Sequence, residues 1–232
     1  MQLSFHFDTD PAPILPAVRD QLARLQRGRF RRGGGLDPIS QLVKSSISSR
    51  TRDEVSQLAF ERLRARFPSW DHLADARAAE VEATIARVTF ADDKARHLVT
   101  ALRRLRAEQG GLDLDFLKDM PVEWAMNRLQ ALPNVGDKVA AAVLNFSTLR
   151  RRVMVVDTHV WRAARRIGLA PANADPRAVR LAIMEQAPPS WTADDFFELH
   201  CLLKGLGQQL CMHDHMDCGH CPLAGFCAQR PL

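Results

Sequence analysis

A tight turn between two apolar segments decides the fold, and its sequence is Leu132-Pro133-Asn134-Val135-Gly136-Asp137-Lys138. An apolar helix is expected to end at Leu132, and a second one to begin directly after the turn. Gly136 can adopt a positive φ and leaves the backbone uncovered. The first N–H groups of the second helix have no partner within it, so they suit an approaching phosphate oxygen. The stretch predicts either an ordinary helix–turn–helix corner or a phosphate-binding turn.

On both sides of this turn, most of the sequence has the periodicity of amphipathic helices. One helix is expected to follow Asp37 as its cap, and another to follow Thr51, with Asp53 and Glu54 in its first turn. The other expected helices cover 14–27, 70–76, 78–87, 92–108, 121–131, 136–148, 158–167, 176–187 and 192–210. The clearest candidate strand is the apolar run 153–156. So many helices without a sheet predict an all-α fold.

A second motif, Val156-Asp157-Thr158-His159-Val160, follows that apolar run and opens another helix. Asp157 is a typical N-cap residue, because its side chain can accept hydrogen bonds from the first N–H groups of the helix. A carboxylate at this place is also available for chemistry. The two roles are compatible.

Cysteines gather near the end of the sequence. Cys211, Cys218, Cys221 and Cys227 lie within one short segment, and Cys201 stands apart on an apolar helix face. No secretion signal is recognisable at the N-terminus, so a reducing compartment is expected and the cluster predicts a metal site rather than disulfides. The spacing alone is compatible with zinc or with an iron–sulfur cluster. We expect Cys201 to be a buried free thiol.

Composition excludes some classes of protein. The 232 residues are 46% hydrophobic and 25% charged, which excludes a wholly disordered or collagen-like chain. No apolar run approaches the length of a membrane span, so no membrane partner is expected. The net charge of +5 is compatible with an anionic partner. The basic, glycine-rich stretch 27–35 is either a solvated linker or a phosphate contact.

Taken together, these motifs carry a resemblance. The hairpin turn, the Val-Asp-Thr-His-Val motif and the C-x6-C-x2-C-x5-C spacing occur in one order over residues 132–227. This combination resembles the endonuclease III family of DNA glycosylases, in the helix-hairpin-helix superfamily, and weaker similarity extends back to about residue 37. The resemblance implies that Cys211, Cys218, Cys221 and Cys227 hold a 4Fe–4S cluster, with each thiolate on one iron.

The resemblance also implies roles for the residues of the two motifs. Lys138 occupies the position of the family's amine nucleophile, and Asp157 that of its catalytic carboxylate. The turn residues Asn134, Val135 and Gly136 are expected to contact the DNA backbone. His159 is expected to line the pocket or to face the DNA. Asn134 replaces the usual first glycine of the turn, and it tolerates a left-handed backbone better than most residues do.

Two further segments resemble those that fill the gap when a nucleotide leaves the duplex. They are Ser48–Asp53, which contains Arg50, and Thr89–Ala95, in which Phe90 stands at the wedge position. Their alternatives are a helix start and a core phenylalanine. The family usually has Gln at the position of Arg50 and Gly at that of Thr89, and an arginine, with a charge and five donors, can read an orphan base or a phosphate differently from glutamine.

The implied architecture has two helical lobes with a DNA groove between them. One is a helical bundle of residues 37–151, and the other joins residues 1–36 and 152–232 and holds the cluster. The implied activity is base excision with AP lyase cleavage, on oxidised pyrimidines in duplex DNA, by a cytoplasmic monomer that is nucleoid-associated if prokaryotic. The alternatives are a different lesion (uracil, an alkylated base, an adenine mispair or an abasic site), a non-catalytic DNA-binding protein with a cluster, and a zinc-stabilised module.

Overall fold

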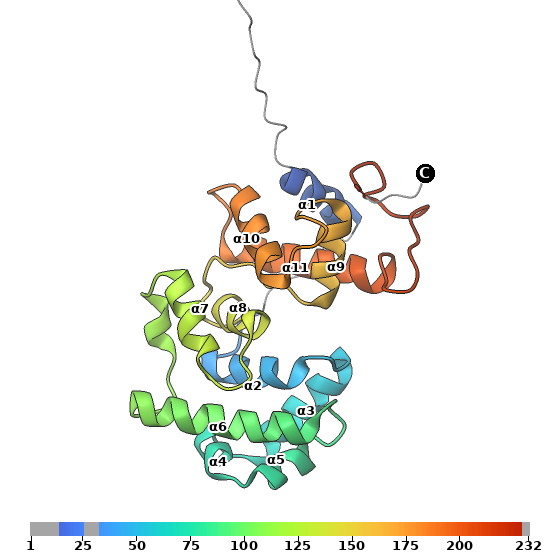
Figure 1. The fold of residues 1–232 in the computed structure, drawn as a ribbon. Helices are drawn as coiled ribbons and strands as arrows, with labels where there is room; N and C mark the ends of the chain where they lie inside the picture. The colour runs from blue at the N-terminus through green and yellow to red at the C-terminus, as the bar shows by residue number, and fades with distance from the viewer. Residues whose placement is uncertain (1–13, 26–32, 229–232) are drawn as a thin grey trace, which may run out of the picture. The chain divides into compact units, whose positions relative to one another are not determined.

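The computed structural model describes residues 14–25 and 33–228, and within these ranges it contains eleven α-helices and one short 3-10 helix (Figure 1). No strand forms in the described part of the chain, where isolated bridges join Leu36 to Ser147 and Cys211 to Met216. The predicted all-α fold is confirmed. Within the same ranges, no helix combines the length and the apolar character that crossing a bilayer requires. Residues 27–32 of the basic stretch lie outside the described residues.

The chain divides into two compact units. The bundle unit comprises residues 31–156 and Thr192–Glu198. Its helices are α2 (Pro38–Ser48), α3 (Asp53–Arg66), α4 (Trp70–Asp75), α5 (Ala78–Thr84), α6 (Ala91–Gln109), the 3-10 helix η1 (Asp115–Lys118), α7 (Val122–Gln130) and α8 (Asp137–Phe146). The cysteine unit comprises α1 (Ile14–Leu25), α9 (Thr158–Ile167), α10 (Pro176–Gln186), most of α11 (Ala193–Gln209) and the loop that follows.

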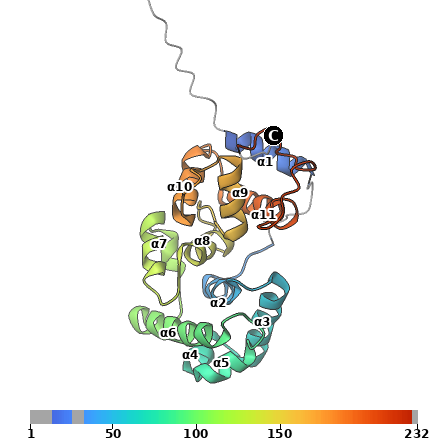
Figure 2. The ribbon, with the colours of Figure 1, turned by 45° about the vertical axis from the view of Figure 1, so that its right-hand side comes forward.

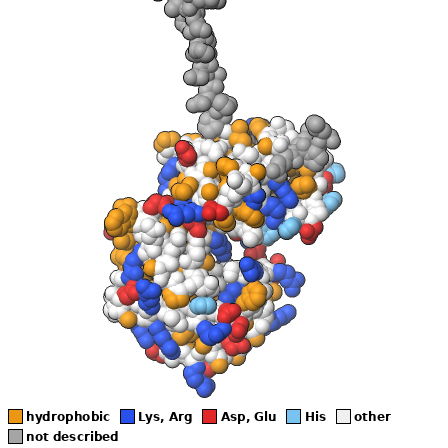
Figure 3. Space-filling view, viewed as in Figure 1, with side chains coloured by type: hydrophobic (Ala, Val, Ile, Leu, Met, Phe, Trp, Pro, Cys, Tyr) orange, Lys and Arg blue, Asp and Glu red, His pale blue; other side chains and the backbone are white. Residues whose placement is uncertain are grey.

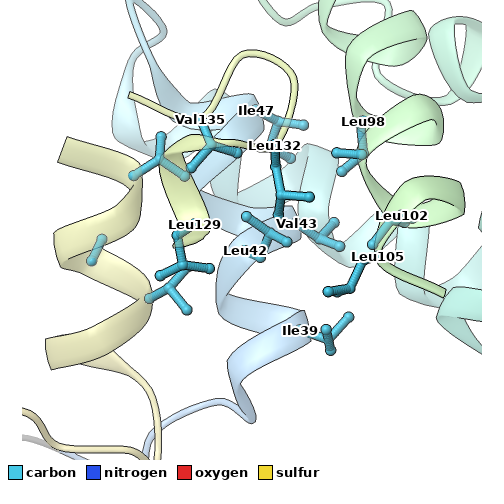
Figure 4. Packing of buried hydrophobic residues seen from close by; sticks show 14 of the residues in the cluster. Ile39, Leu42, Val43, Ile47, Leu98, Leu102, Leu105, Leu129, Leu132 and Val135 are labelled. Carbon is cyan, nitrogen blue, oxygen red and sulfur yellow. The ribbon is translucent and has the colours of Figure 1, made fainter. Parts of the chain in front are cut away.

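Helix α2 lies at the centre of the bundle unit. Figures 1 and 2 show α6 between α2 on one side and α4 with α5 on the other. Figure 4 shows apolar side chains of α2 packed against α6, α7 and the turn before α8: Ile39, Leu42, Val43 and Ile47 meet Leu98, Leu102, Leu105, Leu129, Leu132 and Val135. Each such buried side chain contributes roughly 1.5–3 kcal/mol relative to an exposed one. The core therefore fixes both the end of α2 and the turn.

Capping side chains explain where several helices begin. The Asp37 carboxylate accepts a hydrogen bond from the Ser40 N–H at 2.8 Å, as predicted. The prediction for Thr51 is wrong, because α3 begins at Asp53 and its cap position is Arg52. The Thr51 hydroxyl oxygen instead accepts hydrogen bonds from the Thr89 N–H, in the loop before α6, and from Lys94 Nζ, within α6, which affects the candidate site described below.

The apolar run 153–156 does not form the predicted strand. All four of its side chains are buried, at 2% exposure or less. The run is apolar because it passes through the interior as an irregular segment, and neither of the isolated bridges found in the described part of the chain involves it.

Candidate active site

The turn between α7 and α8 is held from below by the core. Leu132 and Val135 are buried, and the Val135 N–H donates to the Leu132 carbonyl oxygen at 3.2 Å. The left-handed residue of the turn is Asn134, with φ of 58°, whereas Gly136 has an ordinary φ of −88°. A Cβ at Gly136 would meet no atom within 4 Å, so close packing does not require glycine at this position.

Lys138 stands in the first turn of α8 and is half-buried. Its Nζ donates a hydrogen bond to Ser48 Oγ at 2.7 Å. The Ser48 hydroxyl in turn donates to the Ser45 carbonyl oxygen at 2.9 Å, within the last turn of α2. The amine is thus fixed between the start of α8 and the end of α2.

Arg50 and Phe90 lie on two loops that meet beside the end of α2, where Ser48 binds the Lys138 amine. Both have left-handed backbones, with φ of 52° and 58°, which is costly for residues other than glycine. The Arg50 guanidinium lies 5.9 Å from the centre of the Phe90 ring, and 54% of Phe90 is exposed. The alternative of a core phenylalanine is therefore wrong, and an exposed ring paired with a guanidinium stands at the expected wedge position.

One residue of this site was missed by reasoning from sequence. Lys94, near the start of α6, is only 4% exposed. Its Nζ donates to Ile47 O at 3.0 Å, to Ser49 O at 2.5 Å and to Thr51 Oγ1 at 3.2 Å. The signal was present in the helical spacing, because Lys94 falls on the same face of α6 as Leu98 and Leu102.

In the cysteine unit, Asp157 caps α9. Its Oδ1 accepts hydrogen bonds from the N–H groups of His159 and Val160, both at 2.9 Å. His159 Nδ1 lies 3.2 Å from Arg162, which also donates to the carbonyl oxygens of Gly207 and Cys211. A Cβ at Gly207 would come within 2.9 Å of His159, so only glycine allows α11 to approach α9 this closely. The cap, the histidine and the cysteine loop thus form one connected group.

The four clustered cysteines line one pocket, together with apolar side chains that include Leu206 and Leu223. None of the five cysteines is in a disulfide. Arg166 donates to Cys211 Sγ at 3.4 Å, and Cys227 Sγ donates to the Arg166 carbonyl oxygen at 3.2 Å. Burial raises the pKa of the Cys221 thiol. Cys201 is half-buried rather than buried as expected.

Four thiols in an apolar pocket fit the chemistry of an iron–sulfur cluster or of zinc. Within the described ranges, however, no three His, Cys, Asp or Glu side chains are grouped as a bound metal ion would require. The thiols thus share a pocket without converging on one point.

The predicted site residues fall into two sets. The bundle unit brings together Lys138, Arg50 and Phe90, and the cysteine unit brings together Asp157, His159 and the four thiols. Figure 3 shows Lys and Arg side chains interspersed with Asp and Glu on the side of the bundle unit that faces the viewer. In this view the basic side chains of the bundle unit are spread out rather than collected on one element.

Several known proteins are similar to this chain in sequence. A profile described as HhH-GPD superfamily base excision DNA repair protein matches residues 43–189. A protein of Arabidopsis thaliana, provisionally named a DNA glycosylase, is 32% identical over 198 residues, which are 81% of this chain and 66% of that protein. Endonuclease III of Synechocystis sp. is 30% identical over 191 residues, which are 82% of this chain and 80% of that protein.

Solved structures of known proteins are similar to this chain in fold. A trapped covalent intermediate of endonuclease III with DNA superposes with a TM-score of 0.77 at 20% sequence identity. The superposition covers 93% of this chain and 94% of that one. At this identity the likeness establishes the fold and no more.

Proposed function

Because the chain belongs to the HhH-GPD superfamily of base excision DNA repair proteins and is a DNA glycosylase of that superfamily, we propose that it also has AP lyase activity. Its substrates are oxidised pyrimidines in duplex DNA. One observation carries the proposal: Lys138 lies in the first turn of the helix after the hairpin, and its Nζ is held by Ser48 Oγ at 2.7 Å. A monofunctional glycosylase needs no amine there.

Lys138 supplies the nucleophile of the proposed reaction. Its neutral amine attacks C1′ of the target nucleotide, the C1′–N bond breaks, and the damaged base leaves with a proton. The C1′–O4′ bond then breaks as O4′ takes up a proton, so that the sugar ring opens and C1′ becomes a Schiff base with the Lys138 nitrogen. Removal of a proton from C2′ then breaks the C3′–O bond, which cuts the strand 3′ to the lesion. The first turn of α8 supports this role, because the positive end of the helix dipole favours the neutral amine.

Asp157 supplies the carboxylate. Its Oδ1 accepts two backbone N–H groups, so the side chain is held in one orientation at the start of α9. A fixed carboxylate stabilises the positive charge that develops at the sugar as the base leaves. The same residue therefore caps the helix and serves the reaction.

The proposed DNA contacts come from the turn and the two strained loops. The first N–H groups of α8, which follow Asn134, Val135 and Gly136, have no partner within the helix and suit a phosphate. Arg50 and Phe90 are the gap-filling pair, and the arginine in place of the usual glutamine makes lesion choice the first property to measure. We extend the proposal to a monomer that binds damaged or abasic duplex DNA in the cytoplasm, or at the nucleoid in a prokaryotic cell.

Cys211, Cys218, Cys221 and Cys227 are the proposed ligands of a 4Fe–4S cluster. Their shared pocket and their spacing support this assignment. The bound cluster would supply a one-electron redox couple and a rigid anchor for the loop. The chain's own contribution is the hydrogen bond from Arg166 to Cys211 Sγ, since such bonds to sulfur adjust the properties of the metal group.

The test is a panel of duplexes that each carry one defined lesion, incubated with and without borohydride. We expect strand cleavage at oxidised pyrimidines and a borohydride-stabilised adduct with an abasic site. Lys138→Ala should lose the adduct while still binding DNA. The matched control is Lys118→Ala, which changes an exposed lysine of the same unit. Excision without any adduct would leave a monofunctional glycosylase, and activity confined to another lesion would reassign the substrate.

A further inference from the structure

The buried ammonium group of Lys94 is fully used in hydrogen bonding. An ammonium has three N–H donors, and Lys94 Nζ contacts three oxygen acceptors: Ile47 O, Ser49 O and Thr51 Oγ1. Two of these are the carbonyl oxygens of Ile47, in the last turn of α2, and of its C-cap residue Ser49, and carbonyl groups at a helix end have no partner within the helix. The protonated lysine therefore closes the C-terminus of α2, and its neutral form, with two donors, cannot satisfy all three oxygens.

The segment that Lys94 holds carries other parts of the site. Ser48, which accepts the hydrogen bond from Lys138, lies between the two carbonyl groups that Lys94 binds. Arg50 lies between Ser49 and Thr51. The Thr51 hydroxyl also accepts a hydrogen bond from the Thr89 N–H at 3.2 Å, next to the strained Phe90. Lys94 is thus the common attachment of the loops that lie beside the amine.

Electrostatics couples Lys94 to the amine as well. Burial, and then the positive charges of Lys138 and Arg50, lower the pKa of Lys94 to about 8. These two charged groups act on it from α8 and from the loop after α2, and both are cations. Coulomb interactions are mutual, so a charged Lys94 disfavours a charge on Lys138 to a similar degree.

We propose that Lys94 is a positioning residue for Lys138: it holds the Ser48 hydroxyl against the amine, and its charge favours the neutral, nucleophilic form of that amine. This inference rests on the proposed lyase function. It adds a second cation to the site as the group that prepares the nucleophile, beyond the dipole of α8. An amine beside another cation loses its proton at a lower pH, which is a general way to activate a lysine.

A purely structural role for Lys94 predicts something different. If Lys94 only anchored the loops, its loss would slow the reaction by the same factor at every pH. If its charge prepares Lys138, the loss shifts the pH dependence of the amine and leaves the rate at high pH nearly unchanged. The pH profile therefore separates the two roles.

The experiment measures how the reactivity of the Lys138 amine depends on pH, in the protein without DNA. The protein reacts with formaldehyde and cyanoborohydride at a series of pH values, and peptide mass spectrometry quantifies methylation at residue 138. In Lys94→Met we expect the midpoint of the profile to rise by about one pH unit, which is about tenfold slower reaction on the acidic side. Lys94→Arg keeps a positive charge at this place at every pH used and should not raise the midpoint. Lys118→Met is the matched control and should also leave it unchanged.

The outcomes are decisive in either direction. A raised midpoint in Lys94→Met together with a midpoint in Lys94→Arg that is not raised supports the proposal. An unchanged midpoint in Lys94→Met, or an equal rise in both variants, overturns it. If Lys94→Met does not fold, Lys94→Gln, which removes the charge but keeps hydrogen-bond donors, takes its place: a raised midpoint supports the proposal, and an unchanged one overturns it.

A parallel reaction separates this inference from the proposed function. The same proteins are mixed with a duplex that contains an abasic site, and borohydride traps the adduct. A shifted methylation profile with no adduct in the wild type would refute the lyase function and leave the coupling of the two lysines intact. An adduct in the wild type with no shift in Lys94→Met would do the reverse.

Discussion

In the bundle unit, the loops that carry the candidate DNA contacts are anchored in a packed apolar core, whereas the cysteine loop buries very little. Ile47 and Val88, which lead into the two strained loops, are 0% and 4% exposed. In the loop 211–228, Leu223 is the single buried hydrophobic residue among those described. Arg162 and Arg166 hold that loop chiefly by its carbonyl groups.

The two regions keep their functional groups in place by different means. The strained backbones of Arg50 and Phe90 persist because the surrounding core determines them, so that site exists before DNA arrives. The cysteine loop has hydrogen bonds and four thiols but little hydrophobic packing. Its local order is therefore expected to depend on the cluster that the thiols are proposed to bind. Each substitution described next disrupts one of the two regions and leaves the other region as its control.

The largest effect is expected from removing one of the clustered thiols. Cys221→Ala should lose the visible absorbance expected of the proposed cluster and make the loop 211–228 at least about tenfold more sensitive to protease, because metal binding and local order are linked. Limited proteolysis with mass spectrometry measures this, and the bundle unit should stay resistant. Cys201→Ala is the matched control outside the cluster. Equal protection of the loop in both variants would contradict the account.

The next largest effect is expected in the bundle core. Leu42→Ala removes a fully buried side chain of α2 and should lower the free energy of unfolding by about 2–5 kcal/mol. Leu58→Ala, at a leucine that is 40% exposed, should change it by less than about 0.5 kcal/mol. Denaturant titration of both variants measures the difference. A similar loss in both would mean that the core does not hold the site as described.

A smaller effect on stability is expected at the cap of α9. Asp157→Ala should cost about 1 kcal/mol of stability, while Asp157→Asn, which caps nearly as well, should cost a few tenths of this. Both variants lose the carboxylate charge and should excise a damaged base about a hundredfold more slowly or worse. Thermal melts and single-turnover excision separate the two roles. Unchanged excision in Asp157→Asn would remove the carboxylate from the mechanism.

Much of the fold could be predicted from the sequence because typical capping residues mark where several helices begin. Asp37, Asp157 and Asp175 all cap helices through their side chains, and residues of these types are recognisable in the sequence. The run 153–156 misled because periodicity does not separate a buried strand from a buried irregular segment. Thr51 misled because its hydroxyl had a distant partner to bond with.

The candidate site was predictable only where it follows the motifs. Lys138 and the cysteines stand in recognisable spacings, but the burial of Lys94 depends on acceptors contributed by a segment far away in the sequence. The amphipathic pattern of α9 likewise suggests a solvated arginine face, whereas Arg162 and Arg166 bind the cysteine loop. Such roles come from tertiary contacts that no local pattern records.

The central claim, that Lys138 is the nucleophile, is tested most directly by mapping the covalent bond. The full-length protein is trapped with borohydride on a duplex that contains an abasic site, digested, and analysed for the peptide that carries the sugar remnant. The account predicts the remnant on the Nζ of Lys138. A remnant on Lys94 or on any other amine, or no cross-linked peptide at all, would contradict it.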